Sequence, residues 1–140
     1  MKKVAVVYWS GTGNTEAMAD AVAKGAQAAG ASVEKFTASD FAPSSVANYD
    51  AIAFGCPAMG SEQLEDSEFE PMFDSVKGCL SGKLIALFGS YGWGDCEWMR
   101  NWEEDCKAAG AVLACDSVTA NEAPDDAAAE ACRALGAALA

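Results

Sequence analysis

Residues 4–22 read VAVVYWSGTGNTEAMADAV: a short apolar run, a loop of small residues and the start of a helical pattern. The run from Val4 to Tyr8 is continuous rather than alternating, which is typical of a strand buried on both faces of a parallel sheet. The loop that follows reads Ser10-Gly11-Thr12-Gly13-Asn14-Thr15. The segment therefore predicts a strand–loop–helix unit of an α/β fold.

The rest of the chain repeats this alternation. Residues 51–54, 84–88 and 111–115 are further continuous apolar runs, and residues 32–37 form a more polar run typical of an edge strand. Helical patterns lie between them, which implies right-handed crossovers in a parallel sheet with helices on both faces. We expect residues 1–140 to form one domain: a doubly wound five-stranded parallel sheet in the order 2-1-3-4-5.

Several helix boundaries can also be predicted. An apolar stripe at residues 69–76 has the i, i+3, i+4, i+7 spacing of a buried helix face. Ser67 and Glu70 before and within it have the spacing of a capping box. Residues 124–126, Pro-Asp-Asp, are a plausible start for the last helix. A further short helix is expected near residues 43–47.

Composition excludes several classes of function. The chain has a net charge of −12, which repels nucleic acid and anionic membranes and suits docking to basic patches on partner proteins. It has no histidine, and its 6 cysteines form no C-x-x-C pair, which argues against zinc, iron–sulfur and thioredoxin-like chemistry. Two lysines precede the first strand, but no signal-peptide core follows them. We expect a cytoplasmic monomer.

The loop at residues 10–15 has the features of an anion site. Its two glycines let the backbone approach a ligand closely, and the helix that follows offers unpaired N–H groups and a positive dipole end. It lacks both the Walker A ending and the third glycine of a dinucleotide-binding loop, because Glu16 stands there. A neutral cradle of this kind suits a phosphate monoester that is bound but not transferred. A well-capped turn without a ligand is the alternative.

Two further loops should open at the same edge of the sheet, since the carboxyl ends of parallel strands meet there. They read Gly55-Cys56-Pro57-Ala58-Met59-Gly60-Ser61-Glu62 and Gly89-Ser90-Tyr91-Gly92-Trp93-Gly94-Asp95. A tryptophan between glycines could stack on a flat ring or could cover the core, and Trp93 alone does not decide between these.

Together the three loops resemble those of the flavodoxins, and specifically the short-chain members, over the whole chain. The resemblance implies a low-potential one-electron carrier, not an enzyme, which binds FMN non-covalently and shuttles between the semiquinone and hydroquinone states to link redox enzymes. The residues implied to bind FMN are Ser10, Gly11, Thr12, Gly13, Asn14, Thr15, Pro57, Ala58, Met59, Gly60, Glu62, Gly89, Ser90, Tyr91, Gly92, Trp93 and Gly94.

The resemblance also implies individual roles. The first loop would hold the phosphate, and Met59 and Trp93 would cover opposite faces of the isoalloxazine ring. Glu62 would accept a hydrogen bond from flavin N3–H, and the Gly60–Ser61 peptide would turn over on reduction. Pro57 replaces a serine found in some relatives, so a hydroxyl contact is lost. The acids that crowd residues 62–74 and 95–105 would make the second reduction step strongly reducing.

Three other functions are possible. An FMN-dependent quinone reductase could use the same fold, but no insertion supplies a substrate or nicotinamide site. A receiver-type signalling domain shares the strand order, but Ser10 and Cys56 occupy the regions where it needs acidic residues. A flavin-free interaction module is the least specific alternative.

Overall fold

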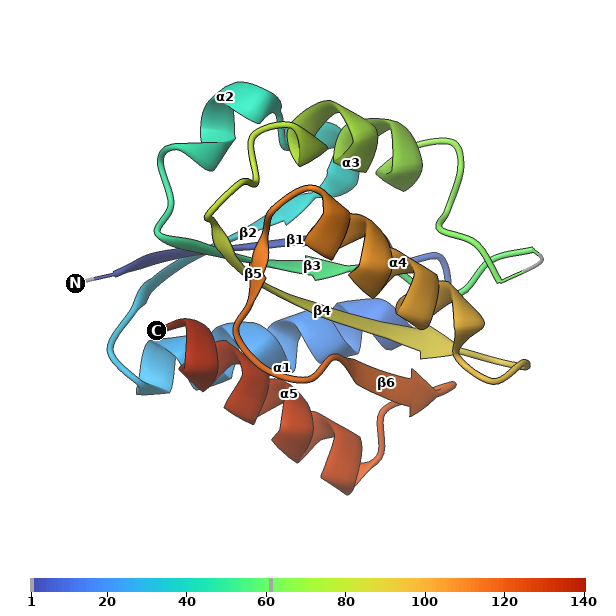
Figure 1. Cartoon of the computed structure of the whole chain (residues 1–140). Helices are drawn as coiled ribbons and strands as arrows, with labels where there is room; N and C mark the ends of the chain where they lie inside the picture. Colours follow the sequence, from blue (N-terminus) through green and yellow to red (C-terminus); the bar gives the residue numbers. More distant parts are fainter. Residues whose placement is uncertain (1, 61) are drawn as a thin grey trace.

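A parallel β-sheet runs through the computed structural model, which describes residues 2–60 and 62–140 (Figure 1). Its order is β2-β1-β3-β4-β5, and β6 also pairs with β4. This confirms the predicted doubly wound order 2-1-3-4-5. The strands are β1 (Lys3–Tyr8), β2 (Ser32–Thr37), β3 (Ala51–Gly55), β4 (Leu84–Tyr91), β5 (Val112–Leu113) and β6 (Val118–Asn121).

The fifth position of the sheet differs from the prediction of one strand at residues 111–115. It consists of two short segments, β5 and β6, which pair with opposite ends of β4. After the Ala114 amide donates to the Ile85 carbonyl at 2.9 Å, the chain leaves β4 and returns at Val118. The second segment, Val-Thr-Ala-Asn, is too short and polar to stand out as a buried strand in the sequence.

Strand β4 is also longer than predicted. Gly89, Ser90 and Tyr91 belong to the strand because β6 pairs with them, whereas the sequence placed them in a loop. The third predicted loop therefore begins at Gly92, and Ser90 is held by the sheet instead of by a flexible turn.

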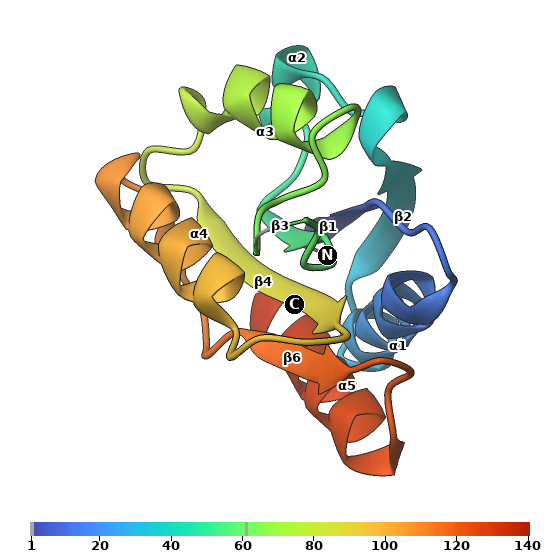
Figure 2. The ribbon, with the colours of Figure 1, turned by 90° about the vertical axis from the view of Figure 1, so that its right-hand side faces the viewer.

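Helices cover both faces of the sheet. In Figure 1, α2, α3 and α4 lie above it and α1 and α5 below it. Figure 2 looks onto the edge formed by the carboxyl ends of the strands, and the same two layers flank the sheet there. The helices are α1 (Asn14–Ala28), α2 (Pro43–Val46), α3 (Phe69–Lys77), α4 (Glu97–Ala108) and α5 (Asp126–Leu139), with a 3₁₀ turn, η1 (Ala38–Asp40).

Alternate strand residues fill two separate cores. Val7, Phe54 and Leu87 point to the α3 and α4 side, whereas Val6 and Phe88 pack against α1 and α5. All of these side chains are fully buried. Strands buried on both faces must be apolar throughout, which explains the continuous runs in the sequence. Among the described residues, no helix is long and apolar enough to cross a membrane.

The start of α3 corrects one sequence prediction. Ser67 and Glu70 do not form a capping box; the carboxylate of Glu65 takes that role. One Glu65 oxygen accepts from the Glu68 and Phe69 amides, both at 2.8 Å, and the other accepts from the Ser67 amide at 2.8 Å and from the Ser67 hydroxyl. Glu65 is 4% exposed. Burial alone would raise its pKa, but these hydrogen bonds outweigh burial and lower the pKa from its usual value.

The start of α5 agrees with the prediction. The Asp125 side chain accepts from the Ala128 amide at 2.8 Å and so caps the helix. Farther along, α5 lies very close to α1: a Cβ atom at Gly136 would fall 2.0 Å from the Val22 carbonyl oxygen. The short helix expected near residues 43–47 is α2.

Candidate functional site

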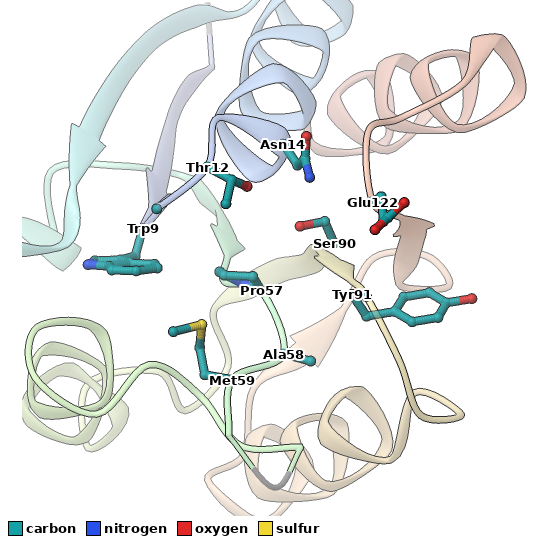
Figure 3. Close-up of a pocket in the computed structure, with 11 residues that line it drawn as sticks. Trp9, Thr12, Asn14, Pro57, Ala58, Met59, Ser90, Tyr91 and Glu122 are labelled. Atoms are coloured by element: carbon teal, nitrogen blue, oxygen red, sulfur yellow. The ribbon is translucent and has the colours of Figure 1, made fainter.

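A cavity of about 260 Å³ opens at the carboxyl edge of the sheet, where the three predicted loops meet (Figure 3). It lies at the point where β1 and β3 are neighbours and the chain winds away on opposite sides, which is the usual ligand position in this fold. Its lining residues are Trp9, Gly11, Thr12, Asn14, Pro57, Ala58, Met59, Ser90, Tyr91, Gly92 and Glu122.

The sequence-predicted site residues fall into three groups. Nine of them line this cavity: Gly11, Thr12, Asn14, Pro57, Ala58, Met59, Ser90, Tyr91 and Gly92. Ser10 and Gly13 line a second cavity of about 460 Å³, which shares Trp9 and Gly11 with the first. The remaining predicted residues line neither cavity: Thr15, Gly60, Glu62, Gly89, Trp93 and Gly94.

The Ser10 side chain fixes the backbone of the first loop through two hydrogen bonds. Its Oγ accepts from the amides of Gly13 at 3.1 Å and Glu16 at 3.3 Å, which replaces a side-chain cap at Gly13 itself. Gly13 has a φ of 95°, a conformation that favours glycine. Within the described part of the chain, the amides of Thr12, Asn14 and Thr15 have no acceptor. Several N–H donors at the start of α1 are thus available to an anion.

Thr15 and Ser90 join the first loop to the third. Their hydroxyls lie 3.0 Å apart, and the Ser90 amide is 3.4 Å from the Thr15 Oγ1. Thr15 is 1% exposed and Ser90 is 5% exposed. A hydrogen bond this deeply buried fixes the spacing between α1 and β4 beneath the cavity.

The second loop turns back on itself. The Met59 amide donates to the Gln63 carbonyl and the Gln63 amide donates to the Met59 carbonyl, both at 2.8 Å. Met59 is 39% exposed and lines the cavity from this turn. The predicted turnover of the Gly60–Ser61 peptide falls on Ser61, which lies outside the described residues.

Further hydrogen bonds tie the second loop to its neighbours. The Ala58 amide donates to the Ser90 carbonyl at 3.0 Å, and the Trp98 indole N–H donates to the Cys56 carbonyl at 3.2 Å. The Cys56 thiol is fully buried below the loop, and burial raises its pKa far above the ordinary value. Cys56 is therefore a packing residue, not a nucleophile.

The third loop carries an exposed aromatic ring. Trp93 is 63% exposed, which is unusual for so large an apolar side chain. Two residues along the chain from Trp93, Asp95 accepts from Arg100 through its carbonyl at 2.7 Å and through its carboxylate at 3.2 Å. The loop thus presents a flat apolar surface that the protein itself leaves uncovered.

Glu62 belongs to the second loop, but its carboxylate lies against Gly94 of the third loop. Its carboxylate accepts from the Glu97 amide at 3.0 Å, at the start of α4. One carboxylate oxygen from each of Glu62, Asp95 and Glu97 lies within 4.8 Å of the other two. This part of the edge therefore holds a concentrated negative charge.

The sequence prediction missed Trp9 and Glu122. Trp9 lies against the first loop, since a Cβ atom at Gly11 would fall 2.9 Å from its ring; its place directly before Ser10 was an available signal. Glu122 follows β6, has a φ of 60° and donates its amide to the Tyr91 carbonyl at 2.7 Å. It could not be placed without knowing that β6 pairs with β4.

The site's chemistry fits a phosphate attached to a planar ring. The donors at the first loop are neutral, and the described residues that line the two cavities include no lysine or arginine. Apolar and sulfur-containing groups, Met59 and Trp93, stand at the other loops. The arrangement can bind an anion through amides and hydroxyls and can cover an aromatic system.

Comparison with known proteins agrees with this geometry. A family model described as flavodoxin matches residues 6–136. The chain is 49% identical to the flavodoxin of Megasphaera elsdenii, covering 98% of each chain, and 47% identical to that of Clostridium beijerinckii, covering 87% of this chain and 88% of the other. The solution structure of two-electron reduced M. elsdenii flavodoxin superposes with a TM-score of 0.90 at 48% identity, over 97% of each chain.

The family match thus extends over nearly the whole chain. The structure has the strand order of that fold, and its three loops meet at one cavity. On these grounds the chain belongs to the flavodoxin family of small FMN-binding electron carriers.

Proposed function

We propose that this chain is a low-potential carrier that passes single electrons between redox enzymes and uses the semiquinone/hydroquinone couple of its FMN. The observation that carries this proposal is the meeting of a neutral anion-binding loop, an exposed tryptophan and a cluster of carboxylates at one sheet edge. When bound, FMN supplies the one-electron chemistry; the protein binds it, orients it and sets its potential.

The first loop is proposed to hold the phosphate. The amides of Thr12, Asn14 and Thr15, which have no acceptor among the described residues, and the hydroxyl of Ser10 lie around the N-terminus of α1. A dianionic phosphate is stabilised there by the dipole of α1 and by hydrogen bonds to the charged acceptor. A neutral cradle suffices because the phosphate is never transferred.

The second and third loops are proposed to hold the ring. Met59 and Trp93 are the exposed large apolar side chains of these loops, and a planar ring between them would cover both. The amides of Gly92 and Trp93 are proposed to meet the pyrimidine edge, and Glu62 to accept from the ring N3–H. Ring stacking contributes about 0.5–1.5 kcal/mol beyond area burial.

The carboxylates are proposed to make the second reduction step strongly reducing. Placing a negative charge about 8 Å from Glu62, at an effective dielectric of about 20, costs about 2 kcal/mol. For a one-electron couple this corresponds to about 90 mV. Asp95 and Glu97 add to the same field, although both are exposed and therefore partly screened.

Exposed acids of the second and third loops and the helices that follow them are proposed to recruit redox partners with basic docking patches. Asp66, Glu68, Glu70, Asp95 and Glu97 are all exposed close to the second and third loops in the chain. Opposite charge on a partner would speed the encounter and bring its redox centre toward the exposed ring edge. We propose that the protein works in this way as a monomer in the cytoplasm.

The alternative is an FMN-dependent quinone reductase on the same fold. Such an enzyme needs sites for a nicotinamide and a quinone beside the flavin. Electron transfer without a substrate site is favoured because the chain matches carriers of its own length almost end to end. Oxidation of NADH by the purified protein alone would favour the reductase.

Stepwise anaerobic reduction of the FMN-loaded protein tests the proposal. We expect a yellow protein that passes through a blue, one-electron reduced form, with a second midpoint potential well below the first. Glu62→Gln should raise the second potential more than Glu130→Gln, which removes an exposed carboxylate from α5 on the opposite face. A colourless protein that takes up no FMN, or a single two-electron step, would refute the proposal.

A further inference from the structure

The Glu62 carboxylate is held by α4 as well as by its own loop. It accepts from the amide of Glu97, the first residue of α4, at 3.0 Å. No side-chain cap from Cys96, the residue before the helix, serves this end of α4. The acceptor comes instead from 35 positions earlier in the sequence, so that Glu62 connects the second loop to the third.

Because Gly94 has no side chain, the Glu62 carboxylate can occupy the space beside it. Its φ is 88°, and a Cβ atom at this position would lie 2.6 Å from the Glu62 Cδ and 2.7 and 3.0 Å from its two oxygens. Real Cβ atoms do not approach other heavy atoms so closely, so any side chain here would displace the carboxylate. By contrast, Gly82 has a φ of 76° but nothing within 4 Å of its Cβ position.

Repulsion from neighbouring carboxylates opposes this position of Glu62, so the hydrogen bond from Glu97 is needed to hold it there. The carboxylates of Asp95 and Glu97 can approach that of Glu62 to within 4.8 Å, and like charges at that range repel. Arg100 pairs with Asp95 and relieves only that member of the cluster. The Glu97 amide and the positive end of α4 are the attractive groups that face Glu62 directly.

We propose that Gly94 and the Glu97 amide are positioning groups, which fix the Glu62 carboxylate at the redox site and thereby help to set the second one-electron potential. Gly94, which the sequence placed among the residues that bind the cofactor, then acts through Glu62 and not by contact. The effect on potential rests on the proposed function, whereas the positioning itself belongs to the protein without its cofactor.

The first test uses the apo-protein and needs no flavin. In NMR spectra, the Glu97 amide proton should lie downfield because it donates to a carboxylate. Gly94→Ala should move it upfield, as Glu62→Gln does, while Gly82→Ala, which imposes similar backbone strain without the contact, should leave it in place. An unmoved Glu97 signal in Gly94→Ala would overturn the positioning role.

The second test measures potentials of the FMN-loaded protein. Gly94→Ala should raise the second potential by about 28 mV or more, a threefold change in the relative affinities for the two reduced states. The shift should largely disappear in the Glu62→Gln background, because the two residues act as one unit. An equal shift in Gly82→Ala, or an undiminished one in the Glu62→Gln background, would refute the proposal.

Backbone strain could prevent Gly94→Ala from folding, so Gly94→Asn and Gly82→Asn form a second matched pair. Asparagine tolerates positive φ better than alanine while still adding a Cβ atom. The same upfield movement of the Glu97 signal is expected in Gly94→Asn alone. If the apo-protein responds in this way but binds no FMN, the proposed function fails and the positioning role stands.

Discussion

Replacing Glu65 by glutamine tests how the second loop is joined to α3. The change keeps the size of the side chain and one carbonyl oxygen, but it replaces the other oxygen by an NH₂ group. That group then faces either the amides of Glu68 and Phe69 or the amide and hydroxyl of Ser67. Toward Glu68 and Phe69 the NH₂ group would face two amide donors, whereas toward Ser67 it would face one, because the Ser67 hydroxyl can turn and accept. At least one hydrogen bond is therefore lost, and the other three no longer involve a charged acceptor.

The expected loss of stability follows from these contacts. Hydrogen bonds to charged groups contribute about 1.5–3 kcal/mol each and neutral ones about 0.5–1.5 kcal/mol, so one lost bond and three weakened bonds together give about 3 kcal/mol. Unfolding entropy of about 2.1 cal/mol/K per residue makes this a fall of about 10 °C in the Tm of a chain of this length. Glu65 is 4% exposed, so solvent cannot replace the lost partners.

Urea unfolding of the apo-protein measures the effect without contributions from bound FMN. Glu70→Gln is the matched control, because it makes the same change on an exposed side chain in the first turn of α3. We expect the control to alter the free energy of unfolding by less than about 0.5 kcal/mol. Equal effects of the two substitutions would refute the assignment of the cap to Glu65.

The effect of pH gives a second check. The native pKa of Glu65 lies below its ordinary value, near 4.3 in unfolded chains, so the carboxylate stabilises the protein above about pH 5. This contribution disappears as the pH falls through the native pKa. The difference in stability between the native protein and Glu65→Gln should therefore shrink in acid; a difference that is constant down to about pH 3 would contradict the argument.

Three other predictions concern the site and the thiols. Trp93→Ala should weaken FMN binding by about two- to thirteenfold, since stacking contributes about 0.5–1.5 kcal/mol; unchanged affinity in a fluorescence titration would show that Trp93 does not stack. Ser90→Ala should destabilise the apo-protein by about 0.5–1.5 kcal/mol because it removes the hydroxyl partner of the buried Thr15 side chain, which keeps only the residue-90 amide at 3.4 Å; thermal unfolding measures this, and an unchanged Tm would contradict it. In native protein at about pH 8, a thiol reagent should modify the exposed Cys79 quickly, but should reach Cys106 and Cys132, whose pKa values burial raises to about 12 and about 11, only as the protein unfolds.

Much of the fold could be predicted because its signals are local. The apolar runs at residues 4–8, 51–54 and 85–88 are buried on both faces, as expected for strands of a covered parallel sheet. The run at residues 111–115 is the exception, since Val112 is 50% exposed. The division of the last strand could not be predicted. Val118 to Asn121 is a strand because it pairs with β4, a non-local cause that leaves no trace in the hydrophobic pattern of the segment itself.

In the candidate site, too, features with local sequence signals could be predicted and features with distant partners could not. The first loop could be located from its own residues, since glycines and small polar groups before a helix favour either an anion site or a capped turn. The partners of Glu62 and Glu65 could not, because both carboxylates accept hydrogen bonds from backbone amides, and any residue offers an amide. The capping box assigned to Ser67 and Glu70 failed for this reason: the spacing was right, but a nearby buried carboxylate took the donors.

These two carboxylates change how the charge of the chain should be interpreted. Glu65 and Glu62 belong to the same acidic stretch of sequence, yet each satisfies donors at the start of a helix, α3 and α4 respectively. Their charges are therefore partly offset by helix N-termini, and they hold the second loop between the two helices. The exposed acids Asp66, Glu68 and Glu70 are left to present charge to a partner. Neutralising those should alter the rate and salt dependence of electron transfer, whereas neutralising Glu62 or Glu65 should alter potential or stability, so a single acidic cluster has two separable physical roles.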